Sequence, residues 1–112
     1  MLYQNYKVTK KYKNCKQNAS LTEGVLIKDK NNIDLLLMGK DYIVSRTIYN
    51  DKEWEAHLQN ALKQIIKPNN KVLVLGGHIG AHALLISKLV GNDGKVSVFE
   101  ANKSLYSKIF KS

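Results

Sequence analysis

The sequence predicts an α/β fold built around residues 71–100, which read KVLVLGGHIGAHALLISKLVGNDGKVSVFE. Two short apolar runs, 72–75 and 96–99, have the length and composition of buried strands. Between them lies a mostly apolar stretch, 81–90, which predicts a helix that ends at Gly91. Strand, glycine-rich turn, helix and strand in this order form the opening unit of a parallel nucleotide-binding sheet.

The turn and the end of the second strand carry the candidate site. Gly76, Gly77 and Gly80 follow the first strand, and Glu100 ends the second. Glycine lets a ligand approach the backbone at the start of the helix, and an acid about 20 residues further on can accept the ribose hydroxyls of an adenosine. The alternatives are a tight turn without a ligand and an ordinary strand-end carboxylate. The order GGHIG departs from G-x-G-x-x-G, which disfavours a nicotinamide-type fold.

The amino-acid sequence of this stretch resembles that of a known family. LGGHIGAHALLISKLVGNDGKVSVFEANKSLY is similar to the opening of FkbM-family methyltransferases, which typically read LDIGANIGxHTL…GxVxAFEPxPxxY. The clear match covers residues 73–106, and a weaker likeness reaches back to Trp54. The resemblance implies an incomplete Rossmann-like class I methyltransferase fold and methyl transfer from S-adenosylmethionine to an oxygen of a small-molecule or saccharide acceptor. It assigns Gly76, Gly77, His78 and Gly80 to the methionine end of the cofactor and Glu100 to its ribose, and it names no catalytic residue.

The chain departs from that family at several positions. Val74 stands where the family has an acid that organises the glycine loop and the cofactor's amino group. His78 replaces an asparagine, and Ala101 replaces a proline. The family's later segments do not follow residue 112. We therefore expect a truncated methyltransferase that is inactive alone, with a non-catalytic fragment that binds an adenosine cofactor as the alternative.

Length and composition limit the number of domains and the kinds of site that the chain can form. A chain of 112 residues forms at most one small domain, and its single cysteine, Cys15, excludes an internal disulfide and favours the cytoplasm. No apolar run approaches the roughly 20 residues that span a membrane. The three histidines do not cluster with other ligands at metal-site spacing, so no metal site is predicted. His57 is expected to be exposed, and His82 to pack or cap rather than react.

The net charge of +9 indicates nucleic-acid binding as a second candidate function. Residues 1–22 form a basic N-terminal arm that contains five lysines, no acid and three interleaved tyrosines: Lys7, Lys10, Lys11, Lys13, Lys16, Tyr3, Tyr6 and Tyr12. Such a segment can bind nucleic acid by charge and stacking. A solvated tail is the favoured interpretation, since charge runs are usually exposed.

Residues 23–49 are predicted to form a small β meander. Strands at 24–28 and 33–38 flank a turn at 29–32, and a third strand is expected at 42–47. A helix then begins at Asn50, with Glu53 completing a capping box, and stops before Pro68. Its predicted buried face comprises Trp54, Leu58, Ala61, Leu62, Ile65 and Ile66, with Trp54 as a core anchor.

Residues 50–112 are predicted to form the N-terminal part of the methyltransferase-like domain. A last helix is expected to start at Asn102 and to carry an apolar stripe of Leu105, Tyr106, Ile109 and Phe110. A sheet with two core strands leaves a long edge unpaired, so self-association is expected as well.

Overall fold

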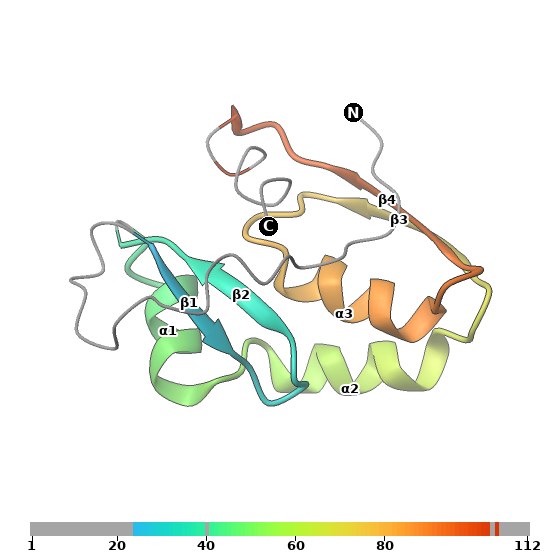
Figure 1. Cartoon of the computed structure of the whole chain (residues 1–112), viewed down its shortest axis with the longest axis horizontal. Coiled ribbons are helices and arrows are strands. Elements are labelled where there is room, and N and C mark those ends of the chain that lie inside the picture. Colours follow the sequence, from blue (N-terminus) through green and yellow to red (C-terminus); the bar gives the residue numbers. More distant parts are fainter. Residues whose placement is uncertain (1–23, 40, 104, 106–112) are drawn as a thin grey trace.

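The computed structural model describes residues 24–39, 41–103 and 105. This part of the chain is a small α/β fold with two two-stranded sheets and three helices. In Figure 1, α3 runs beneath the β3–β4 sheet, α2 lies on the other side of α3, and the β1–β2 hairpin packs beside them with α1. The basic arm at 1–22, and Tyr106, Ile109 and Phe110 of the predicted last helix, lie outside the described residues.

The predicted hairpin is confirmed. β1 (Val25–Lys28) pairs antiparallel with β2 (Asp34–Leu37), and Val25 lies opposite Leu37. The turn between them is held by the Asp29 carboxylate, whose Oδ1 accepts the backbone N–H groups of Asn31 and Ile33 at 2.8 and 2.9 Å. Alternate residues of both strands are buried, as expected for a sheet with one face on the core.

The predicted third strand at 42–47 is wrong, because these residues begin helix α1 (Val44–Asp51). The cause is the side chain of Asp41, whose carboxylate accepts the backbone N–H groups of Ile43, Val44 and Ser45. These are N–H groups that a helix start leaves without intrahelical partners, so their satisfaction favours a helix over a strand. In the described residues, the hairpin therefore has no third strand.

The predicted helix start at Asn50 is also wrong. Asn50 lies within α1, which ends at Lys52 in a left-handed conformation (φ 59°). α2 (Ala56–Ile65) starts only after Glu55, which is left-handed too (φ 47°). Glu53 forms no capping box and pairs instead with Lys30, at 2.7 Å between Oε2 and Nζ. Two helices with a sharp break thus replace the single predicted one.

The prediction of which residues form the apolar face of the helix before Pro68 is confirmed only in part. Ile66 is buried and Trp54 packs against the core, but Leu58 and Ile65 are 39% and 72% exposed. Gln59 is buried in their place, and its Oε1 accepts a hydrogen bond from Asn31 Nδ2 at 2.7 Å. A polar contact with the hairpin turn thus takes the place of part of the predicted apolar face.

The predicted strand–turn–helix–strand unit is confirmed. β3 (Lys71–Leu75) and β4 (Lys95–Phe99) are parallel and paired from Lys71–Lys95 to Leu75–Phe99, with α3 (Ala81–Val90) between them in the chain. α3 is apolar on nearly all sides because it is buried between two surfaces. Toward the sheet it contributes Ala83, Ile86 and Val90, which pack against Val96 and Val98.

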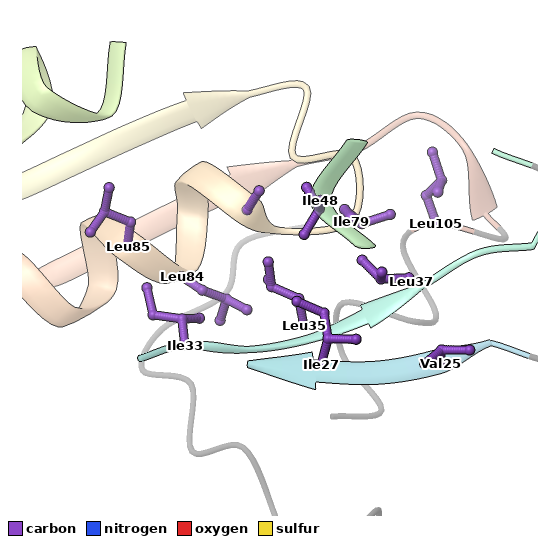
Figure 2. Close-up of a cluster of buried hydrophobic side chains, with 11 residues drawn as sticks. Val25, Ile27, Ile33, Leu35, Leu37, Ile48, Ile79, Leu84, Leu85 and Leu105 are labelled. Atoms are coloured by element: carbon purple, nitrogen blue, oxygen red, sulfur yellow. The ribbon is translucent and has the colours of Figure 1, made fainter. Parts of the chain in front are cut away.

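The other side of α3 packs on the hairpin. Figure 2 shows Leu84 and Leu85 of α3 beside Ile33 and Leu35 of the hairpin strand β2 and its turn. The complete cluster contains Val25, Ile27, Ile33, Leu35, Leu37, Ile48, Ile79, Ala81, Leu84, Leu85 and Leu105. One helix therefore joins both sheets, and it fixes the hairpin and α1 next to the glycine turn.

The face of the β3–β4 sheet that points away from α3 is only partly covered, because Ser97 on this face is buried while its apolar neighbours are not. Its apolar residues Leu73, Leu75 and Phe99 are 58%, 75% and 40% exposed. Parallel sheets are normally covered on both faces, so this surface has the character of an interface. Of the predicted fold class, the structure establishes the α/β part.

Candidate functional site

A cavity of about 350 Å³ lies beside the glycine turn, where β3 ends and α3 begins. Its walls come from α1, from the α1–α2 connection, and from the end of β3, the turn and the first residues of α3. The lining residues are Val44, Trp54, Glu55, Val74, Leu75, Gly76, Gly77, His78, Ile79, Ala81 and His82. Ligands of open α/β sheets bind outside the carboxyl ends of the strands, which is the position of this cavity.

The glycine turn is tied to the end of the neighbouring strand. The N–H groups of Gly76 and Gly77 both donate to the carbonyl oxygen of Phe99, at 2.8 and 3.2 Å. Gly76 is left-handed (φ 81°), and a Cβ added there would meet no atom within 4 Å. Gly80 is buried and left-handed (φ 94°), and it precedes α3 without any side chain that caps the helix. Gly76 therefore presents bare backbone to open space, whereas Gly77 and Gly80 are buried.

Glu100 contacts this turn directly. Its Oε2 accepts the backbone N–H of His78 at 2.8 Å, and its Oε1 accepts the N–H of Asn102 at 2.8 Å. The structure thus brings Glu100 and His78 together, although they are 22 residues apart in the chain. Glu100 does not line the cavity, and neither does Gly80. The carboxylate supports the turn, and its contact with a ribose stays a prediction.

Two histidines lie at the cavity. His78, which is left-handed (φ 48°), has a half-exposed side chain whose Nε2 is 3.9 Å from Oδ2 of Asp41. His82, in the first turn of α3, places Nε2 2.8 Å from Oε2 of Glu55. The Nδ1 atoms of both rings are buried and, within the described residues, lack a hydrogen-bond partner. His57 is exposed, as predicted.

Sequence reasoning missed Glu55 as a site residue and favoured a core anchor over a ligand platform for Trp54. Both line the cavity, and Trp54 also packs against the first core cluster. No local pattern marks Glu55, because its position depends on the break between α1 and α2 and on contact with His82, 27 residues away. Val74 lines the cavity with an apolar side chain where the resembled family has an acid.

The described residues contain no group of three or more His, Cys, Asp or Glu side chains that could hold a metal ion. Among the helices of residues 24–39, 41–103 and 105, none has both the length and the apolar character needed to span a membrane. No protein-family model, curated protein or solved structure matches this chain. The fold and the cavity therefore define the chain as an α/β protein with a candidate ligand site at the carboxyl end of a parallel strand pair.

Proposed function

We propose that this chain binds S-adenosylmethionine in the cavity beside the glycine turn. The observation that carries the proposal is the parallel β3–β4 pair with an open, glycine-lined cavity at its carboxyl end. A volume of about 350 Å³ falls within the range of roughly 300–1,000 Å³ that small-molecule sites occupy. The resemblance of residues 73–106 to FkbM-family methyltransferases supplies the identity of the ligand and the Rossmann-like class I fold.

The proposed chemistry is methyl transfer to an oxygen of a small-molecule or saccharide acceptor in the cytoplasm. Within the described residues, Gly76 and Gly77 leave room for the cofactor, and Trp54 and Val44 provide apolar walls that exclude water. Catalysis of this kind depends mainly on holding the acceptor oxygen in line with the methyl group. Binding of the cofactor without turnover would correspond to a non-catalytic fragment.

Titration calorimetry of the purified chain with S-adenosylmethionine, and with NAD for comparison, tests the proposal. We expect saturable binding of S-adenosylmethionine and none of NAD. Gly76→Ala should weaken that binding at least about tenfold, because the new methyl group would occupy the space left for the ligand. Gly91→Ala is the control, since Gly91 also has a positive φ (72°) and open space around it but lies at the far end of α3. A folded sample that binds neither ligand, or both equally, would refute the proposal.

The predicted ribose role of Glu100 needs a comparison on the ligand side, because this carboxylate also supports the turn. Glu100→Gln should weaken adenosine binding more than 2′,3′-dideoxyadenosine binding if the carboxylate accepts the ribose hydroxyls. Each charge-assisted hydrogen bond lost contributes about 1.5–3 kcal/mol. An equal loss for both ligands would assign Glu100 to the turn alone.

A further inference from the structure

We infer that Glu55 recognises the ammonium group of the cofactor's methionine end. The inference rests on the proposed function and concerns the same cavity. It extends the site to the α1–α2 connection, which the family resemblance assigns no role. The ligand class it requires is an adenosine derivative that carries a cationic amine.

The cavity offers such an amine one anionic partner. Glu55 is the one carboxylate among the described residues that line it, and Val74, at the end of β3, is apolar. A buried or half-buried ammonium needs an opposite charge or hydrogen-bond acceptors to offset the loss of water. Trp54 precedes Glu55 on the same wall, and an indole face also attracts cations.

His82 fixes the position of this carboxylate. Its Nε2 lies 2.8 Å from Glu55 Oε2, which connects the α1–α2 connection to the first turn of α3. A carboxylate accepts about four hydrogen bonds, so one contact with His82 leaves most of its accepting capacity. The Glu55 side chain is 41% exposed, and a ligand in the cavity can therefore reach it.

The backbone of Glu55 is held in an uncommon conformation. With φ 47° and ψ 58° it is left-handed, a conformation that residues other than glycine adopt at an energetic cost. Glu55 stands immediately before α2, yet its side chain makes no capping hydrogen bond there. The carboxylate instead lies 2.8 Å from His82 Nε2 at the cavity, and uncommon backbone conformations of this kind concentrate at functional sites.

The test measures two ligands against three variants. S-adenosylhomocysteine carries the ammonium group, and 5′-methylthioadenosine lacks the amino-acid part. Glu55→Gln should weaken S-adenosylhomocysteine binding about tenfold, as expected for one charge-assisted hydrogen bond, and leave 5′-methylthioadenosine binding unchanged. Glu55→Asp, which keeps the charge, should preserve part of the preference. Glu53→Gln is the matched control, because Glu53 pairs with Lys30 and does not line the cavity.

The outcomes separate the two hypotheses. If the parent chain binds neither ligand, the proposed function fails and the role of Glu55 fails with it. If the parent binds both ligands and Glu55→Gln weakens both equally or neither, the role of Glu55 is wrong while the proposed site stands. A selective loss with Glu55→Gln that Glu53→Gln does not reproduce supports the inference.

Discussion

Replacing Asp41 by alanine should destabilise the fold by removing the cap of α1. The Asp41 carboxylate accepts four hydrogen bonds, which come from the backbone N–H groups of Ile43, Val44 and Ser45 and from the hydroxyl of Ser45. Ser45 is fully buried, and its Oγ in turn accepts the backbone N–H of Met38 at the end of the hairpin. One side chain thus connects the hairpin to α1.

The magnitude follows from these contacts. Loss of a helix cap costs about 1 kcal/mol, and a buried hydroxyl left without its acceptor costs about 1–3 kcal/mol more. We therefore expect Asp41→Ala to lower the free energy of unfolding by about 2–4 kcal/mol, a large part of the stability of a small domain. Asp41→Asn keeps one acceptor oxygen and should cost about 1 kcal/mol.

The same contacts make this contribution depend on pH. Burial of the Asp41 carboxylate opposes its ionisation, but the hydrogen bonds donated by Ser45, Ile43 and Val44 outweigh it and hold the pKa of Asp41 below 3.8. Because the folded pKa is lowered, the stabilisation is complete above the unfolded pKa of about 3.9 and is lost as the pH falls through the folded pKa. The difference between the parent and Asp41→Asn should accordingly shrink from pH 7 to pH 2.

Urea unfolding of the parent, Asp41→Ala and Asp41→Asn at pH 7, 4 and 2 measures both effects. Asp93→Asn is the control, because Asp93 is an exposed aspartate in the turn between α3 and β4. Equal stability of Asp41→Ala and the parent at pH 7 would refute the capping role. A parent–Asp41→Asn difference that stays constant with pH would show that the ionised carboxylate is not the stabilising species.

Two further changes test the packing. Gly94→Ala should lower the free energy of unfolding by about 1–3 kcal/mol, because its Cβ would overlap the Val90 Cβ and lie 2.6 Å from the Val90 carbonyl oxygen. A Gly94→Ala variant as stable as the parent in urea would contradict this packing. We also propose that the exposed apolar residues Leu73, Leu75 and Phe99 of the β3–β4 sheet drive self-association, so Leu75→Lys should lower the average mass in sedimentation equilibrium. Ile65→Lys, which removes an equally exposed apolar side chain from α2, should leave it unchanged, and a parent chain that stays monomeric would refute the proposal.

The segment from β3 to β4 could be predicted because each of its signals is local. Two runs of four mostly apolar residues, a glycine at each end of an apolar helix and the order of the elements define it without knowledge of the remaining chain. The parallel pairing of the two strands then follows from the usual geometry of such connections. The position of Glu100 at the same edge as the glycine turn follows as well, since the ends of neighbouring parallel strands meet there, but its hydrogen bond with the His78 N–H is not predicted.

Residues 41–55 could not be predicted in the same way. Tyr42, Ile43 and Val44 favour a strand by propensity, yet they lead into a helix because the Asp41 carboxylate accepts the first N–H groups of that helix. The difference between the two outcomes is a few hydrogen bonds from one side chain. Propensity is a weaker influence than such contacts, so the helix start could be found only with the cap in view.

The wrong prediction of a single helix from Asn50 concerns the candidate site directly. A single helix from Asn50, as predicted, would place Glu55 within a regular turn, with its side chain direction set by the helix. The left-handed residues Lys52 and Glu55 instead interrupt the helix between α1 and α2. The Glu55 carboxylate then lies 2.8 Å from His82. The strand–turn–helix unit supplies one wall of the cavity, and this break supplies the opposite one together with its charge. The stretch that propensity predicts worst is therefore the one that bounds the cavity beside the glycine turn.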